Sequence, residues 1–322
     1  MKSKTTTRLI GLVGILISVA CIALLGRSID FSKTWEVIRQ VNPLMVVAMM
    51  AIYLLTFPLR SMRWRIMMKS FNVPHDGVFI QSLFIGFAGN NLLPARGGEL
   101  LRMEAFSRKT GISRTTSLSS ILIEKVMDVV ILLSILVGAF IAMRETSEVI
   151  TKTMYIMVPA TLAVLLVIVV VAIWGARIAA WFSTKPNKLF QTAGRLLANV
   201  HSSLNFARSG GSLLRIFLLS ALIWSIEVSL YAVGLRAIGV EYALLMVSMT
   251  ALVLVNFSIL VPSSPGYIGV FHAALVLALA IFKIPSESAL AAAVLIHASQ
   301  ILPVTVLGLV VGARYIVSTK NT

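Results

Sequence analysis

Long apolar stretches are the feature that most limits what this chain can fold into. A helix that spans a bilayer needs roughly 20 apolar residues, and six stretches come close to that length. They cover about 9–26, 43–59, 121–143, 153–174, 213–235 and 288–312. Two further apolar stretches, about 78–93 and about 243–282, are interrupted by polar residues, proline and glycine. With 58% hydrophobic residues and a mean hydropathy of +0.94, the sequence predicts an all-α polytopic membrane protein.

The basic residues are distributed unevenly between the two ends of these stretches. The chain has 28 Lys and Arg against 12 Asp and Glu, and basic residues gather in cytoplasmic loops. Most of them fall on one side if both termini are cytoplasmic, so we expect a multi-pass protein of the cytoplasmic (inner) membrane. Because this bias accounts for the charge, no nucleic-acid partner is expected. The first stretch lacks a signal-peptide cleavage site, and we expect it to be an uncleaved span.

The two interrupted stretches divide the chain into two similar units. Each unit, about 44–143 and about 213–313, has a span, an interrupted hairpin and a second span in the same order. The predicted orientation makes each hairpin enter and leave on one side, so both are predicted to be re-entrant. The two units would then form an inverted repeat within a single domain, 1–322. Any two membrane segments broken by proline and glycine would align in a similar way.

Two basic segments outside the spans are predicted to lie at the cytoplasmic surface. Residues 176–212 mix basic and apolar side chains, which indicates an amphipathic interfacial linker between the units. Contact with anionic lipid would give the same pattern as a plain linker. In residues 60–69, arginines surround Trp64, which is suited to the headgroup level, so we expect simple anchoring there.

The first break places polar and helix-breaking residues at the end of an apolar run. It contains Asn90, Asn91, Pro94, Arg96, Gly97, Gly98 and Glu99. A broken helix at membrane depth is tolerated only where it is buried in protein or lines a wet cavity. Free backbone NH groups and a guanidinium favour a phosphate. Alternatively, Arg96 pairs with Glu99 or another acid and only locks the hairpin.

The second break carries no formal charge and offers mainly backbone donors. Its candidate residues are Pro262, Ser264, Pro265, Gly266, Gly269 and His272. Within the last span, His297 and Gln300 are further polar positions. The two histidines could titrate near neutral pH and couple to a proton gradient, although a hydrogen-bonded packing role is the more common one for a single membrane histidine.

Ionisable residues inside apolar stretches are costly and usually face a partner or a water-filled path. Glu227 lies in the middle of one predicted span. Glu124 and Asp128 are four residues apart and share one helix face. They could hold a cation, relay protons or pair with arginines. The candidate arginines are Arg60, Arg63 and Arg102.

Recognisable catalytic signatures do not occur in the sequence. There is no nucleophile motif, H-E-x-x-H, P-loop or dinucleotide fingerprint. The single cysteine, Cys21, leaves no thiol cluster with metal-ligand spacing. We therefore expect a transporter rather than an enzyme, and no cofactor or metal.

Four motifs in order resemble the lysylphosphatidylglycerol synthase transmembrane region, also called the flippase-like domain family. They are R-S-M-R-W-R at 60–65, N-L-L-P-A-R-G-G-E at 91–99 followed by Arg102, E-K-V-M-D at 124–128 and P-S-S-P-G-Y-I-G at 262–269. The resemblance covers nearly the whole chain. It implies a cytoplasmic-membrane protein of the class that moves an aminoacylated phospholipid between leaflets. The aminoacyl-transferring domain of the synthase is absent from this sequence, so lysine transfer is not expected.

Four residues depart from the pattern that this resemblance implies. Lys125 and His297 stand where arginine is usual, Tyr267 where a second glycine is common, and His272 where an acid is common. If positions 272 and 297 are in contact, the usual acid and base would form an ion pair. Replacement of both by histidine would then leave neither charge unpaired. The departures leave the substrate open.

Three functions compete at this point. The leading prediction is a translocase for a phospholipid, glycolipid or polyprenyl phosphate. A second is a membrane-embedded phosphatase or transferase acting on polyprenyl phosphate, with Glu99 and Glu124 as acid or base. The third is a non-transporting membrane partner of a glycosyltransferase. All three have a membrane lipid as substrate or setting, and the first and third allow a lipid-modifying partner.

Overall fold

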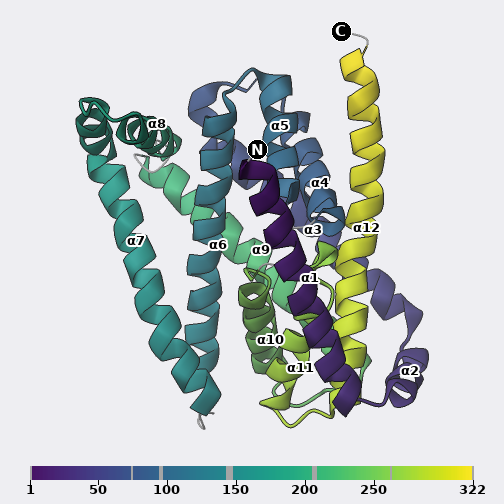
Figure 1. Cartoon of the computed structure of the whole chain (residues 1–322). Coiled ribbons are helices and arrows are strands. Elements are labelled where there is room, and N and C mark those ends of the chain that lie inside the picture. The colour runs from purple at the N-terminus through teal and green to yellow at the C-terminus, as the bar shows by residue number, and fades with distance from the viewer. Residues whose placement is uncertain are drawn as a thin grey trace.

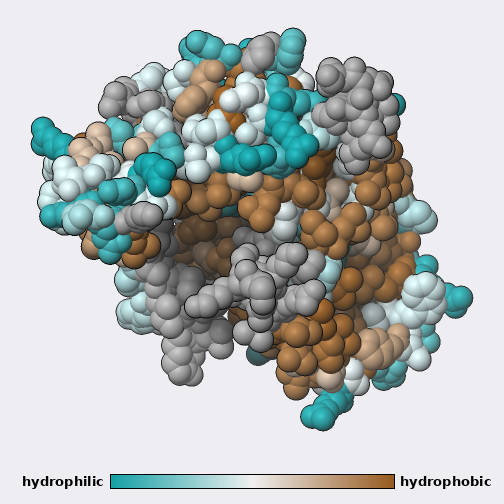
Figure 2. Space-filling view, turned by 45° about the horizontal axis from the view of Figure 1, so that its top comes forward, coloured by the Kyte–Doolittle hydropathy of each residue, from teal (hydrophilic) through white to brown (hydrophobic). Residues whose placement is uncertain are grey.

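The protein is all-helical throughout the part that the structure describes. The computed structural model describes residues 2–73, 75–93, 97–142, 148–204, 209–261 and 263–320. No strand occurs within these ranges. Figure 1 shows long, roughly aligned helices, and both chain ends lie toward the upper end of the bundle. Figure 2 shows brown apolar side chains over much of the middle of the visible face and teal hydrophilic ones toward its ends.

Six long helices coincide with the six predicted spans. They are α1 (Lys2–Ser28), α3 (Pro43–Met67), α6 (Arg114–Ala142), α7 (Glu148–Ser183), α9 (Gly210–Ala237) and α12 (Ser286–Lys320). Of these, α3, α9 and α12 are both long and apolar enough to cross a membrane by length and composition alone. At 1.5 Å per residue, even the 25-residue α3 is longer than the hydrocarbon core, which is roughly 30 Å thick. The prediction of an all-α polytopic membrane protein is confirmed.

The two interrupted stretches form pairs of short helices. The first pair is α4 (Gly77–Leu92) and α5 (Gly97–Thr110), and the second is α10 (Leu244–Ser258) and α11 (Val270–Ala280). A short 3₁₀ turn, η3 (Pro265–Tyr267), interrupts the second connection. The order span, helix pair, span therefore occurs twice, as α3 to α6 and as α9 to α12. This order agrees with the predicted units, whose inverted relation stays a prediction.

Glycine allows α4 and α5 to pack with their backbones almost in contact. A Cβ atom on Gly98 would lie 1.9 Å from the carbonyl oxygen of Gly86 and 2.3 Å from the backbone nitrogen of Asn90. Only a residue without a Cβ fits at that distance, so Gly98 allows the two helices of the hairpin to pack closely. Its role in the fold is steric.

Aromatic side chains join this hairpin to α3. Phe57 of α3 stacks on Phe84 of α4 with ring centroids 4.5 Å apart. Trp64 of α3 contacts Phe79 of α4 and Phe106 of α5 at 5.2 and 4.4 Å. Further along the chain, α9 packs against α3, and α12 packs against α4 and α3. The core of the protein therefore lies where the two predicted units meet.

Trp64 corrects one sequence prediction. Residues 60–69 were expected to anchor the protein at the headgroup level, yet Trp64 is completely buried and donates its indole NH to the Ser120 hydroxyl at 3.0 Å. Arg60 and Arg63 of the same segment are also buried. Helix α3 continues to Met67 before the short turn η1 (Lys69–Phe71), so these side chains face neighbouring helices rather than the membrane surface.

Residues 176–212, predicted to be an interfacial linker, contain the end of one helix and a separate helix. Residues up to Ser183 continue α7, and the separate helix α8 (Lys188–Ser203) then packs against α7 and α6. Figure 1 shows α8 across the upper end of α7. Trp181, Leu189 and Phe190 are exposed, as expected for an amphipathic segment that contacts a bilayer surface.

A short helix near the N-terminus was not predicted. Helix α2 (Phe31–Gln40) begins at Asp30, whose side chain accepts a hydrogen bond from the Ser32 backbone at 2.9 Å. This is a typical N-cap. The helix meets α1 at 89° and exposes Phe31 and Trp35. Its ten residues are too few to cross a membrane, so the search for long apolar stretches missed it.

Candidate functional site

A buried network of charges joins α3, α5, α6 and α9. Arg63 donates to both carboxylate oxygens of Asp128 at 2.6 and 3.3 Å and lies 3.3 Å from Glu124. Arg102 binds Glu124 through two bonds of 2.7 and 3.2 Å. Of the three uses considered for the two carboxylates, pairing with arginine is the one that this geometry bears out.

A second buried pair lies beside this network. Arg60 of α3 donates to Glu227 of α9, and both side chains are almost fully buried. The Arg60 guanidinium also lies 5.7 Å from the Trp224 ring. The indole NH of Trp224 in turn donates to Asp128 at 3.1 Å. Side chains of α9 therefore contact both the Arg60–Glu227 pair and the charge network around Arg63.

The third ion pair is the most accessible of the set. Lys125 of α6 lies 3.3 Å from Glu99 of α5, with side chains 34% and 18% exposed. Glu99 also accepts a bond from Asn90 at 3.4 Å. The Arg63 and Asp128 side chains are 0% and 8% exposed by comparison. Glu99 was considered as a partner of Arg96, which lies outside the described residues.

The charges of these pairs balance. Four bases, Arg60, Arg63, Arg102 and Lys125, face four acids, Glu99, Glu124, Asp128 and Glu227. A buried charge without a partner is strongly destabilising, so a balanced cluster is the arrangement that membrane depth requires. A ligand that brings a net charge into this cluster must displace one partner or change its protonation.

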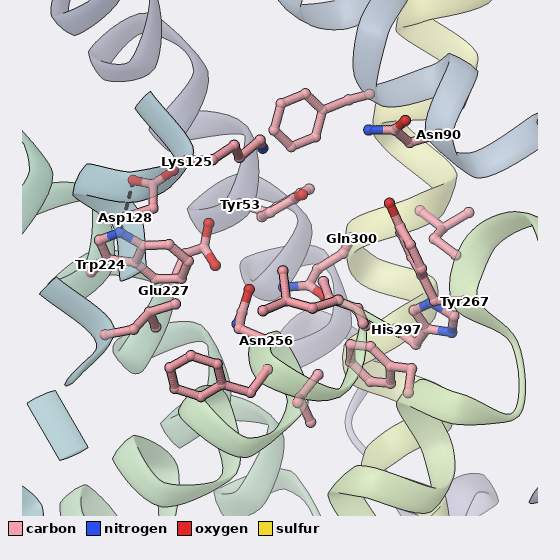
Figure 3. A pocket seen from close by; sticks show the side chains of 18 of the residues that line it. Tyr53, Asn90, Lys125, Asp128, Trp224, Glu227, Asn256, Tyr267, His297 and Gln300 are labelled. Atoms are coloured by element: carbon pink, nitrogen blue, oxygen red, sulfur yellow. Dashed lines mark hydrogen bonds between the residues drawn. The ribbon is translucent and has the colours of Figure 1, made fainter. Parts of the chain in front are cut away.

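A cavity of about 160 Å³, lined by charged, polar and apolar side chains, opens beside the ion pairs. Figure 3 shows that its side chains come from both predicted units and converge on one space. The charged residues that line it are Arg60, Glu99, Lys125, Asp128 and Glu227. The uncharged polar residues are Tyr53, Asn90, Asn91, Tyr231, Asn256, Tyr267, His297 and Gln300. Asn91 is held by the Thr305 hydroxyl of α12 at 2.9 Å, which ties the first hairpin to the last helix.

The two histidines are in contact, as the paired departures predicted. Their ring centroids lie 5.0 Å apart in an edge-to-face arrangement, and Phe271 stacks on His297 at 4.1 Å. Only His297 lines the cavity. His272 faces a second, mostly apolar pocket between α1, α2, α11 and α12.

The second break packs against α1. Ser264 donates its backbone NH to the Ser18 hydroxyl at 2.9 Å. Gly266 and Gly269 have φ angles of 66° and 89°, which glycine adopts without strain. A Cβ on Gly269 would lie 2.5 Å from the Ser18 carbonyl oxygen. Ser264 and Gly269 therefore shape the turn and seat it on α1.

The predicted site residues fall into three groups. Those that line the cavity are Arg60, Asn90, Asn91, Glu99, Asp128, Glu227 and His297. Those that support it or build the breaks are Arg63, Gly97, Gly98, Arg102, Glu124, Ser264, Pro265, Gly266, Gly269 and His272. Pro94, Arg96 and Pro262 lie outside the described residues. A binding role for all of them stays a prediction.

Sequence reasoning missed several residues of the cavity wall. Tyr53, Trp224 and Asn256 line it but were not selected. Asn256 carried a signal, because an amide within an apolar stretch is costly at membrane depth. Tyr53 and Trp224 carried none, since an aromatic residue in a span is usually a packing or interfacial residue.

These features define an all-helical polytopic membrane protein with an internal cluster of balanced charges and a polar cavity. Residues 11–308 match the family described as the lysylphosphatidylglycerol synthase TM region. The chain therefore belongs to this family, as its four motifs predicted.

One curated relative is the glycosyltransferase AglD of Haloferax volcanii. The two proteins are 25% identical over 331 aligned positions, which cover 92% of this chain and 53% of AglD. The chain thus spans about half the length of this relative.

Proposed function

We propose that this protein moves a phosphate-containing lipid between the two leaflets of the cytoplasmic membrane. The headgroup would pass through the polar cavity while the tails stay in the bilayer. The observation that carries the proposal is the cavity itself, which places five charged and several amide side chains among membrane helices. Polar groups at that depth are costly and usually mark a substrate path. Membership of the family is a second support.

The pair of Lys125 and Glu99 is where a phosphate would enter. It is the most exposed of the buried ion pairs, and its 3.3 Å separation is longer than the tightest contacts of the other pairs. Exchange of the Glu99 carboxylate for a phosphate oxygen keeps Lys125 neutralised. The displaced Glu99 then takes up a proton or turns to solvent, which preserves the charge balance. Arg96, three residues before Glu99 in the sequence, is proposed as a second phosphate ligand.

Alternation between the two leaflets would come from rocking of the two units, about 44–143 and about 213–313, against each other. The repeated order of elements supports this. The cavity is lined by side chains from both units, so relative movement would change its access. Both chain ends lie toward one end of the bundle, which agrees with the proposed cytoplasmic location of both termini.

A second candidate is suggested by the relative, whose name describes a glycosyltransferase. In that case the cavity would hold a polyprenyl phosphate for chemistry, with Glu99 as acid or base, or the chain would hold a separate glycosyltransferase at the membrane. Product formation by the purified protein would identify an enzyme. Activity that requires an added transferase would identify a partner.

Lipid movement in liposomes that contain the purified full chain tests the proposal. The assay follows the exposure of a labelled phosphate lipid in the outer leaflet. Because a hydrogen bond to a charged group contributes about 1.5–3 kcal/mol, we expect Lys125→Gln to slow movement by roughly 10- to 100-fold. Lys125→Arg, which keeps the charge, should retain most of it.

Lys109→Gln is the matched control. Lys109 is an exposed lysine of α5 that binds Gln81 at 2.8 Å, away from the cavity. Its replacement should leave movement unchanged. If wild-type protein moves no phosphate lipid, or if the Lys125 and Lys109 variants behave alike, the proposal is wrong.

A further inference from the structure

The two ends of the cavity differ in chemistry. Figure 3 shows Lys125, Asp128 and Glu227 on one side and Tyr267 and His297 on the other. The charged residues labelled in Figure 3 all lie on the first side. The second side, which we call the uncharged end, is formed by Tyr267 of η3 and by His297 and Gln300 of α12. A headgroup that fills the cavity therefore meets ionic partners at one end and only neutral ones at the other.

His297 carries a polar atom that has no hydrogen-bond partner among the described residues. The residue is 5% exposed, and its Nε2 atom makes no hydrogen bond to any of them. Phe271 stacks on the ring and His272 packs against its plane, so the ring is held where it is. A buried polar atom without a partner is destabilising. Since His297 lines the cavity, a ligand there can supply the missing bond.

The partner that fits best is a hydroxyl group. Nε2 donates in one tautomer of neutral histidine and accepts in the other, and a hydroxyl can match either role. An amide on the same helix extends this preference. Gln300, three residues after His297, offers both a donor and an acceptor. A charged group at this end would find no counter-ion among the described lining residues.

Aromatic faces complete the uncharged end. Phe271 and Tyr267 line the cavity on this side, and Tyr53 lies across it. Hydrogen-bonding groups combined with flat apolar faces suit a ring that has hydroxyls at its edge and CH groups on its faces. The volume of about 160 Å³ is close to the roughly 150 Å³ of a protein cavity that binds one benzene ring, so one such ring has room in it.

We infer that the uncharged end is a sugar subsite. The substrate class is then a lipid whose headgroup is a single sugar joined to a phosphate. The sugar hydroxyls bind His297 and Gln300, and the phosphate lies toward Lys125. This inference rests on the proposed lipid translocation and names the headgroup that the same cavity selects. A site built to bind hydroxyls strongly rejects an analogue that lacks them.

Paired lipids test the inference. Liposomes with the full chain receive a short-chain polyprenyl phosphate that carries one hexose, the same lipid without the sugar, or labelled phosphatidylethanolamine. We expect the hexose-bearing lipid to move at least about tenfold faster than the other two. Free hexose 1-phosphate, added as a competitor, should slow this movement if the headgroup alone is recognised, and its failure to compete at any concentration would count against a sugar subsite.

Gln300→Met separates the subsite from the rest of the cavity, because it removes the amide and keeps the side-chain length. It should slow movement of the hexose-bearing lipid by about five- to tenfold, the value of one hydrogen bond, and lower the preference for this lipid over the bare phosphate lipid by about the same factor. His297→Phe should act in the same way, since its ring can still stack on Phe271. Gln191→Met, at an exposed position of α8, is the matched control. Thermal unfolding shows that each variant is folded.

The outcomes distinguish the inference from the function on which it rests. Equal movement of the bare and the hexose-bearing lipid, with no effect of Gln300→Met, overturns the sugar subsite and leaves lipid translocation standing. A preference for phosphatidylethanolamine also overturns it and identifies the cavity as an ammonium site. If folded wild-type protein moves neither phosphate lipid, both the subsite and the proposed function are wrong.

Discussion

Replacement of Glu124 by glutamine tests whether the buried charge network holds the helices together. Glu124 is completely buried and is the carboxylate bound by Arg102, through bonds of 2.7 and 3.2 Å. Arg63 also lies 3.3 Å away but keeps Asp128 as a partner. The change therefore leaves one arginine, Arg102, without a counter-charge. Removal of one member of a buried pair typically costs about 3–5 kcal/mol, and we expect a loss of stability in that range.

A double replacement gives the sharper result. Arg102→Met alone leaves Glu124 facing only Arg63 and also loses the contact of the guanidinium with Trp64, 3.9 Å from the ring centroid. In the double variant no unpaired charge remains, so the main loss is that cation–π contact, worth up to about 2 kcal/mol. We expect the double variant to be more stable than the sum of the two single changes predicts, by at least about 2 kcal/mol.

The measurement is the free energy of unfolding of the purified protein in detergent, from a denaturant titration followed by tryptophan fluorescence. Glu36→Gln, at an exposed position of α2, is the control and should change little. The reasoning is refuted if Glu124→Gln stays within about 1 kcal/mol of wild type, or if the two single changes simply add, since independent sites add in this way.

Two other predictions concern the first hairpin. Gly98→Ala should greatly reduce the yield of folded protein, because its Cβ would lie 1.9 Å from the Gly86 carbonyl oxygen. The control Gly138→Ala should be tolerated, since no atom lies within 4 Å of the added Cβ. Equal melting temperatures of the two variants would contradict this steric role of Gly98. In the middle of α5, a hydrogen bond from Arg114 is the largest cause that lowers the pKa of Glu104 from 4.5 to about 2. A lowered pKa stabilises the folded state above the unfolded value, so the stability advantage of wild type over Glu104→Gln should be complete above about pH 4.5 and disappear as the pH falls toward 2. Melting curves across this range measure it, and a constant difference would refute it.

The balance of the charge cluster bears on how a substrate would bind. Each of its four bases already has an acid within 4 Å. An added anion is therefore bound by exchange rather than by filling an empty positive site. The exchange is easiest at Lys125, where one partner is still accessible to solvent, and hardest at Arg63, which is 0% exposed. Lys125 is therefore the position at which an anion would enter the cluster most readily.

The sequence alone was sufficient for the class of protein and for the position of its main elements. Apolar length and helix breaks are properties of consecutive residues, so hydropathy along the chain located the six long helices and both helix pairs. Proximity along one helix face also made Glu124 and Asp128 a pair, and arginine was among their considered partners. The histidine contact followed from two coordinated departures. All of these inferences depend on local sequence or on motif composition.

Only the tertiary structure decided which distant faces meet. Arg60 chooses Glu227, 167 positions away, and nothing in the local pattern around either residue selects that partner. Trp64 is buried rather than interfacial because α5 and α6 cover its side of α3. The cavity, with its charged and uncharged ends, exists only where both helix pairs meet α3, α6, α9 and α12. The pairing of polar groups at membrane depth depends on the mutual rotation of helices, and hydropathy along a single helix does not contain that information.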